Sequence, residues 1–197
     1  MVREPCCRTC GYPFYGQLEG LRVCGHCAHL SPVFSEGMTL LLHRGVGRSL
    51  VKELKYHQGT YLVEDLLTLA QLRPGLTSHL DGGVLVPVPL HPHKERERGF
   101  NQSRILAEAF SRRYQLAVAP VLERTRNTVS QTQLSREERL KNMKNAFVLG
   151  PGAALDETMK YILVDDVFTT GATLNAAAAV LRTAGAGDIR VLTMAHG

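Results

Sequence analysis

The sequence contains no tryptophan, and aromatic residues make up only 6% of its 197 positions. Single-stranded nucleic acids are commonly held by bases that stack on aromatic side chains, so a surface built mainly on stacking is not expected. No run of 18 apolar residues occurs, which excludes a transmembrane helix, and we expect no membrane insertion. The opening segment MVREPCC lacks the apolar stretch of a signal peptide, so we expect a cytoplasmic protein.

Cysteine is confined to the first 30 residues, where all five cysteines lie. In a reducing cytoplasm such residues favour metal ligation or catalysis over structural disulfides. Cys7-x-x-Cys10 and Cys24-x-x-Cys27 have the spacing of a four-thiolate zinc ribbon. Because four protein ligands leave no open position on Zn²⁺, the expected role of the metal is structural.

Other ligand sets and another chemistry remain open for this segment. Cys6 can replace Cys7 as a ligand, and His26 and His29 are further candidates. A redox dithiol is the rival interpretation, but it explains one cysteine pair and not two. A segment this short cannot build its own core, so we expect residues 1–35 to form a metal-supported module and residues 36–197 the main domain.

The positive charge of the chain is unevenly distributed. Residues 91–144 contain twelve Lys and Arg against six Asp and Glu, and the rest of the chain contains eleven against twelve. Such an excess fits an anionic partner, namely pyrophosphate, a nucleotide or a nucleic acid. The alternative is a solvated helical face, because four glutamates are interleaved with these cations: Glu95, Glu97, Glu137 and Glu138.

Short apolar strands alternate with helical segments along the chain, which predicts an α/β fold with a parallel sheet. The expected strands cover residues 38–43, 84–86, 116–122, 146–149, 161–164 and 189–194. Helices are expected over residues 47–56, 61–72 and 173–184. A further helix is expected to begin at a cap at Asn101 or Ser103 and to carry Ile105, Leu106, Ala109 and Phe110 on one face. Polar loops are expected over residues 74–83 and 90–100.

The most informative motif is residues 161–173, YILVDDVFTTGAT, in which an apolar strand runs into two carboxylates, a small-residue loop and a helix. Open α/β sheets bind ligands at the carboxyl ends of their strands. Backbone N–H groups at the helix start favour a phosphate, which Gly171 allows to approach closely. Asp165 and Asp166 suit the two donors of a vicinal diol and can hold waters around Mg²⁺. The alternative is that the acids merely end a strand and Thr173 caps a helix, but all these features occur together in register.

This motif resembles the phosphoribosyl pyrophosphate site of the type I phosphoribosyltransferases. The resemblance implies the type I core fold, Mg²⁺ as cofactor, and a ribose whose 2′- and 3′-hydroxyls bind Asp165 and Asp166. It further implies a 5′-phosphate site on the following loop, made of Val167, Phe168, Thr169, Thr170, Gly171, Ala172 and Thr173.

Three further motifs are similar to the competence protein F (ComF, GntX-like) family. They are Leu54-Lys55-Tyr56, then Val86-Pro87-Val88-Pro89 leading to Arg98-Gly99-Phe100-Asn101-Gln102, and Thr128-x-x-Gln131-x-x-Leu134 followed by Arg139, Asn142, Ala146 and Phe147. With the cysteine segment, the resemblance covers nearly the whole chain. It implies a link to natural competence, the uptake of DNA, with single-stranded DNA and a helicase-like competence protein as partners.

Two basic segments supply candidates for binding the pyrophosphate. Residues 90–100 follow the first core strand, where type I enzymes bind pyrophosphate, and Arg98 is assigned a catalytic role because it lies in a family-like motif. The other candidates there are His91, His93, Lys94 and Arg96, and the alternative is a solvated loop in which Glu95 and Glu97 cancel the charge.

Residues 124–145 match the position of the mobile catalytic loop of type I enzymes, whose closure excludes water. Arg139 is assigned a catalytic role there. Arg124, Arg126, Gln131 and Asn142 are further candidates, and the alternative is a charged surface helix over residues 135–144.

Two functions fit these features. The first is an enzyme that transfers phosphoribose from phosphoribosyl pyrophosphate to a nitrogen acceptor with Mg²⁺. The second is a non-catalytic competence protein that senses phosphoribosyl pyrophosphate and binds single-stranded DNA. Residues 38–80 and the ribbon lie where the enzymes carry an acceptor-binding hood, and they contain no base-reading motif.

Overall fold

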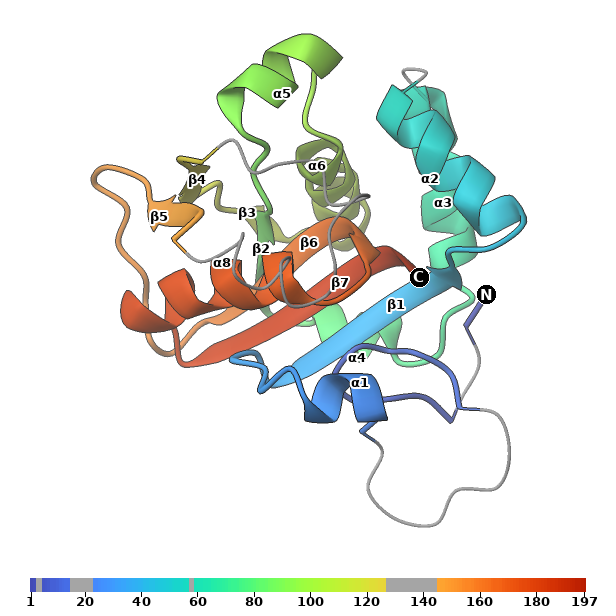
Figure 1. Cartoon of the computed structure of the whole chain (residues 1–197), viewed down its shortest axis with the longest axis horizontal. Coiled ribbons are helices and arrows are strands. Elements are labelled where there is room, and N and C mark those ends of the chain that lie inside the picture. Colours follow the sequence, from blue (N-terminus) through green and yellow to red (C-terminus); the bar gives the residue numbers. More distant parts are fainter. Residues whose placement is uncertain (3–4, 15–22, 57–58, 127–144) are drawn as a thin grey trace.

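The computed structural model describes residues 1–2, 5–14, 23–56, 59–126 and 145–197. Its centre is a parallel sheet with helices on both faces (Figure 1). The five strands lie in the order β1-β7-β6-β2-β3, with bounds β1 Glu36–Leu42, β2 Gly83–Pro87, β3 Ala117–Val118, β6 Lys160–Phe168 and β7 Asp188–His196. This is the arrangement expected of a type I phosphoribosyltransferase core, and its strands all present their carboxyl ends at one edge.

The helices and the remaining strands connect this sheet. The helices are α1 Gly25–Ala28, α2 Val46–Tyr56, the 3₁₀ turn η1 Gly59–Leu62, α3 Val63–Ala70, α4 Leu76–Leu80, α5 Pro92–Arg98, α6 Gln102–Tyr114 and α8 Ala172–Thr183. A separate antiparallel pair consists of β4 Leu122–Arg124 and β5 Phe147–Leu149. No helix in the described part of the chain is long and apolar enough to cross a membrane.

The sheet separates two apolar clusters, because successive side chains of a strand point to opposite faces. Leu163 of β6 packs on the face covered by α8. Its neighbours Ile162 and Val164 pack on the opposite face against α2, α3, α4 and α6. All three side chains are fully buried, which explains why β6 reads as a continuous apolar run in the sequence.

The N-terminal segment covers the outer edge of β1. The Val2 N–H donates to the Leu40 carbonyl at 2.9 Å, and the Gly37 N–H donates to the Arg8 carbonyl at 2.9 Å. A Cβ atom at Gly37 would lie 2.1 Å from the Thr9 carbonyl oxygen, so this approach requires glycine. The segment therefore satisfies backbone groups that an edge strand would otherwise expose.

Residues 92–98 form helix α5 within the segment 90–100, where the sequence predicted a loop. Helix α5 has no buried residue, so no apolar stripe marks it. Its ends are nevertheless defined locally, because the His91 ring accepts from the His93 N–H at 3.2 Å and Pro92 occupies the first turn. Gly99 ends the helix with φ 83°, a conformation that favours glycine.

Other boundaries also differ from the prediction. The expected strand over residues 116–122 is divided into β3 and β4, which belong to different sheets. Pro120 lies between them and has no N–H to continue a ladder. The expected loop over residues 74–83 contains α4, and β6 continues through Asp165 and Asp166 to Phe168. The acids therefore lie within a strand and not after it.

Candidate functional site

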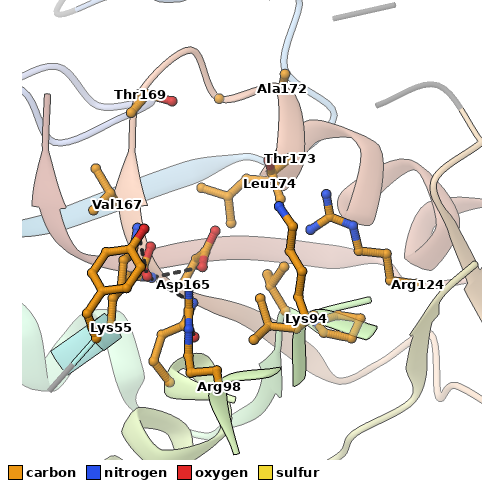
Figure 2. A pocket seen from close by; sticks show the side chains of 17 residues that line it. Lys55, Lys94, Arg98, Arg124, Asp165, Val167, Thr169, Ala172, Thr173 and Leu174 are labelled. Carbon is orange, nitrogen blue, oxygen red and sulfur yellow. Dashed lines mark hydrogen bonds and ion pairs between the residues drawn. The ribbon is translucent and has the colours of Figure 1, made fainter. Parts of the chain in front are cut away.

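A cavity of about 230 Å³ opens at the carboxyl edge of the sheet, where β6 meets the start of α8 (Figure 2). Both acids of the pair lie in its wall. The lining residues are Lys55, Tyr56, Val88, Pro89, Leu90, Lys94, Arg98, Gln102, Arg124, Asp165, Asp166, Val167, Thr169, Gly171, Ala172, Thr173 and Leu174. Segments far apart in the sequence thus meet at the position where open α/β sheets bind their ligands.

The first turn of α6 holds the acid pair. The Ser103 hydroxyl donates to Asp165 Oδ1 at 2.9 Å, and the Gln102 amide donates to Asp166 Oδ2 at 2.9 Å. The turn is itself fixed by Asn101, whose side chain caps α6 and donates to the Val88 carbonyl at 3.1 Å. All three polar side chains of this turn are buried, so their hydrogen bonds are not exchanged with water.

Cations from two other helices connect to the acid pair, Lys55 by direct contact and Arg98 through Gln102. The Lys55 ammonium at the end of α2 lies 3.1 Å from Asp166 Oδ2. The Arg98 guanidinium donates to the Gln102 side-chain oxygen and lies 5.4 Å above the centre of the Tyr56 ring. Asp166 is thereby connected to both α2 and α5.

Asp165 is difficult to ionise in this position. Burial raises the pKa of its carboxyl to about 7, and the neighbouring charge of Asp166 acts in the same direction. The Asp166 N–H, which donates to Asp165 Oδ1 at 2.9 Å, lowers that pKa in part. Asp165 therefore changes its charge near neutral pH.

The wall opposite Lys55 is also cationic. Figure 2 shows Lys94 and Arg124 extending towards the start of α8, where Thr173 and Leu174 lie. Desolvation lowers the pKa of Lys94, and the charges of Arg124 and Arg98 lower it further. Desolvation likewise lowers the pKa of Arg124. Positive charges held this close to one another favour an anionic ligand between them.

The residues of the predicted phosphate loop divide between the cavity and the core. Val167, Thr169, Gly171, Ala172 and Thr173 line the cavity. Two further members of the predicted set are buried and do not line it, namely Phe168 and Thr170.

Gly171 is required by the packing beneath the loop. Its φ of 75° is a left-handed conformation, and a Cβ atom there would lie 2.6 Å from Leu30 and 2.7 Å from the Phe168 ring. The sequence alone explains this glycine by the close approach of a phosphate, whereas in the structure the crowding comes from the core.

The two basic segments are placed differently. Of the candidates in residues 90–100, Lys94 and Arg98 line the cavity, whereas His93 and Arg96 are exposed on α5 outside it. Arg124 also lines the cavity. Arg139, together with Gln131 and Asn142, lies outside the described residues.

Three residues that contact the acid pair have no site role predicted from the sequence. Lys55 and Gln102 occur in the motifs shared with the competence protein F family, but their spacing does not indicate contact with the acids. Ser103 is predicted only as a possible helix cap, and Asn101 is the residue that takes that place. The contacts of all three depend on how α2 packs against β1 and β7 and how α6 packs against β6, which local pattern does not reveal.

Four of the five cysteines form a cluster near the N-terminus. Their sulfur atoms, from Cys7, Cys10, Cys24 and Cys27, all lie within 4.8 Å of one another. The Cys10 and Cys24 sulfurs are 3.8 Å apart. Tetrahedral Zn²⁺ with Zn–S bonds of about 2.3 Å places its sulfurs about 3.8 Å apart. The cluster therefore has the composition and size for a metal ion such as Zn²⁺.

The fifth cysteine lies outside this cluster. Cys6 Sγ accepts a hydrogen bond from Arg73 Nη2 at 3.1 Å, whereas Cys7 Sγ accepts from the Cys24 N–H at 3.3 Å. Cys7 is therefore the ligand that the geometry selects. All five cysteines are free of disulfides, as expected for a metal-binding set.

Comparison with known proteins identifies the family. No model of a known protein family matches the chain. It is 30% identical over 200 residues to competence protein F of Haemophilus influenzae, which covers 98% of this chain and 85% of that protein. It is also 30% identical over 190 residues to the DNA utilization protein YhgH of Escherichia coli, covering 94% of this chain and 81% of that protein.

A third relative matches a shorter segment. Competence protein ComFC of Bacillus subtilis is 37% identical over 98 residues, which make up 50% of this chain and 38% of that protein. The near full-length matches carry the assignment, because they include both the cysteine segment and the sheet with its acid pair. On this basis the chain belongs to the competence protein F family.

Proposed function

We propose that the chain binds phosphoribosyl pyrophosphate in the cavity between β6, α8 and α5, and that it transfers the phosphoribosyl group to a nitrogen acceptor. The observation that carries this proposal is the meeting of three elements in one cavity: two adjacent carboxylates, a helix start lined with threonines, and cations from three other segments. The three elements suit the ribose, the 5′-phosphate and the pyrophosphate of phosphoribosyl pyrophosphate, respectively.

The acid pair suits the ribose. Two carboxylates held side by side accept hydrogen bonds from the two hydroxyls of a vicinal diol. Beside them, the loop between β6 and α8 presents Thr169 and Thr173 and the N-terminus of a twelve-residue helix. The N–H groups and the dipole at such a helix start favour a phosphate. Both features belong to one continuous segment, as a ribose with its 5′-phosphate attached requires.

The cations suit the pyrophosphate. Lys94, Arg98 and Arg124 line the same cavity as the acids and provide charge-assisted donors. Within the described residues, the cysteine cluster is the only group of three or more metal-ligating side chains. Mg²⁺ commonly binds one or two carboxylates and the phosphates of a substrate, so Asp165 and Asp166 fit an ion that arrives with the pyrophosphate. When bound, Mg²⁺ would neutralise negative charge on the leaving group.

The chemistry requires little beyond this arrangement. In the proposed transfer the C1′–O bond breaks with its electron pair leaving on the pyrophosphate, and the acceptor nitrogen bonds to C1′ and releases its proton to solvent. Lys94, Arg98 and Arg124 stabilise the charge that develops on the leaving group. The acceptor nitrogen must approach C1′ from the side away from the departing pyrophosphate, and Lys55 of α2 lies opposite Lys94 and Arg124 in the cavity wall (Figure 2). We infer that the acceptor enters from that side.

The cysteine cluster is proposed to hold a structural Zn²⁺. Four thiolates occupy every position of a tetrahedral ion, so no site remains for a substrate. Cys7, Cys10 and Cys27 are buried, which fits a closed site rather than a reactive dithiol.

A second candidate function is the binding of single-stranded DNA without catalysis. The relatives are named for competence and DNA utilization. The observation that favours DNA is the exposed face of α2, where Arg48, Lys52 and Tyr56 follow one another at intervals of four residues. This row of cations and one aromatic leads to the cavity, because Tyr56 also lines it. Under this hypothesis a helicase-like competence protein is the expected partner.

The zinc proposal predicts one metal ion per chain. Native mass spectrometry should show one Zn²⁺ in the wild-type protein and none in Cys10→Ser, because three thiolates bind the ion far more weakly. Cys6→Ser is the matched control and should retain the metal, since Cys6 contacts Arg73 instead of the cluster. Loss of metal in Cys6→Ser with retention in Cys10→Ser would refute the assignment.

The ribose site is tested by ligand-induced stabilisation. Phosphoribosyl pyrophosphate with Mg²⁺ at 100 times its dissociation constant should stabilise the protein by about 2.7 kcal/mol, which raises the melting temperature by roughly 5–10 °C. Asp165→Asn should weaken binding about tenfold, because a charge-assisted hydrogen bond to a ribose hydroxyl becomes a neutral one. Asp65→Asn on the exposed surface of α3 serves as the control and should leave the shift unchanged. Equal shifts in both variants would place the ligand elsewhere.

The raised pKa of Asp165 predicts a pH dependence of binding. Below its pKa of about 7 the Asp165 carboxyl is protonated. It must ionise to accept a charge-assisted hydrogen bond from a ribose hydroxyl. Affinity for phosphoribosyl pyrophosphate should therefore rise roughly tenfold between pH 6 and pH 8, following the ionised fraction. Affinity is measured by calorimetry for the wild type and for Asp165→Asn. The pH profile of the variant reports the titration of the ligand's own phosphates and is subtracted from the wild-type profile. A wild-type profile identical to that of the variant would contradict this role.

The DNA hypothesis predicts that the affinity for single-stranded DNA depends on salt and that cations of α2 cause part of this dependence. Removing one cation that pairs with a phosphate of a single strand should reduce the slope of log affinity against log salt by about 0.7. Arg48→Ala and Lys52→Ala should each produce that reduction in fluorescence anisotropy titrations with a labelled oligonucleotide. Arg112→Ala at the end of α6, which pairs with Glu64, is the control. Slopes that do not change in either α2 variant would remove the observation that favours DNA at this face.

A further inference from the structure

The phosphate loop, here defined as Thr169–Thr173, is supported from below by the cysteine segment. Leu30, which is 5% exposed, packs under Gly171 so closely that no Cβ atom fits between them. The Leu30 N–H donates to the Cys27 carbonyl at 3.1 Å. The residue under the loop therefore lies three positions after one proposed metal ligand and is hydrogen-bonded to it.

A hydrogen bond fixes the start of α8 to the same segment. The Val33 N–H donates to Asn175 Oδ1 at 2.7 Å, and Asn175 lies in the first turn of α8. The Val33 carbonyl in turn accepts from Arg182 near the end of that helix at 3.4 Å. Helix α8, whose N-terminus faces the cavity, is thus held at both ends by one residue of the segment.

Ring contacts continue the connection. The Phe34 ring meets the edge of Phe168 with centroids 6.5 Å apart, and Phe168 stacks on His196 at 4.9 Å. His196 contacts Tyr12 at 4.8 Å, and the Tyr12 carbonyl accepts from the Cys7 N–H at 2.7 Å. A second row of packed groups therefore runs from the cysteine cluster to the residue before the phosphate loop.

We propose that residues 30–34 position the phosphate loop, so that metal binding at the cysteine cluster and phosphate binding at the loop are thermodynamically coupled. This inference rests on the proposed function for its ligand. Leu30 and Asn175 are positioning residues here, because they act on the loop and on α8 and do not line the cavity.

The two sites are coupled because a bound metal orders the cysteine segment. Helix α1 is only four residues long and is flanked by Cys24 and contains Cys27, so a bound metal fixes both of its ends. Without the metal the thiolates no longer fix α1, and we expect Leu30 and Val33 to be held less firmly. The phosphate loop must then be ordered by the ligand itself, which lowers the apparent affinity. Coupling is reciprocal, so the phosphate ligand must raise the metal affinity by the same factor.

The first experiment follows amide hydrogen exchange in the protein with bound Zn²⁺ and after removal of the metal by a chelator. We expect faster exchange at Thr169–Asn175 after removal, with exchange in α6 unchanged. Faster exchange that stays within residues 5–29 would overturn the proposal. This experiment needs no phosphate ligand, so it is independent of the proposed function.

The second experiment measures the coupling in both directions with ribose 5-phosphate as the probe. We expect metal to raise the affinity for ribose 5-phosphate roughly tenfold, and ribose 5-phosphate to raise the affinity for Co²⁺ by the same factor. Co²⁺ reports thiolate coordination through its absorption spectrum. Equal affinity with and without metal overturns the coupling and leaves the proposed function intact. Absence of probe binding in both states counts against the proposed function and the ligand part of this proposal.

Variants of the metal-loaded protein identify the residues that carry the coupling. Asn175→Ala should reduce it, and Asn175→Asp should retain it, because a carboxylate still accepts from the Val33 N–H. The negative charge added in Asn175→Asp changes the affinity for ribose 5-phosphate equally with and without metal, so it cancels in the ratio of the two affinities. Leu30→Ala should reduce the coupling, whereas Leu50→Ala, which removes the same side chain from the opposite apolar cluster, should leave it unchanged. Full coupling in both Asn175→Ala and Leu30→Ala would overturn the proposal.

Discussion

The hydrogen bonds from the first turn of α6 to the acid pair are the contacts on which the candidate site most depends. Two carboxylates side by side in a buried strand repel each other and lose hydration, which is costly unless donors replace the water. Gln102 and Ser103 supply those donors, and Lys55 adds a positive charge. The same turn also receives Arg98, so the orientation of the acids and the placement of the cations are fixed together. A change at the start of α6 would therefore affect both halves of the cavity.

The parts of the structure that the sequence predicts correctly are those set by local pattern. The apolar run before Asp165 is buried on both sides, which gives β6 a signal that needs no tertiary information. The cysteine spacing defines a four-sulfur cluster for a similar reason, because each pair lies in one tight turn. Asn101 is one of the two caps predicted for α6, and its side chain accepts from two N–H groups of the first turn. In each case the residues that interact are close in sequence.

The parts that the sequence does not reveal depend on how distant elements pack. Lys55 and Asp166 are 111 positions apart in the sequence, and the packing of α2 on the neighbouring strands β7 and β1 brings them together. Helix α5 is polar on every side, so periodicity gives no indication of it. Phe168 lies within the phosphate motif, yet strand alternation turns its ring into the core, where it meets Phe34. The support of Gly171 by Leu30 likewise joins the two ends of the chain, and no pattern in either segment predicts it.

A crystal structure of the protein with phosphoribosyl pyrophosphate and Mg²⁺ would show whether this cavity is the phosphoribosyl site. We expect the ribose hydroxyls within hydrogen-bonding distance of Asp165 and Asp166, with the 5′-phosphate on the backbone N–H groups of Thr169–Thr173. The pyrophosphate should lie among Lys94, Arg98 and Arg124. A ligand bound outside this cavity, or one whose phosphates contact neither the loop nor these cations, would show that the acid pair and the loop do not form this site.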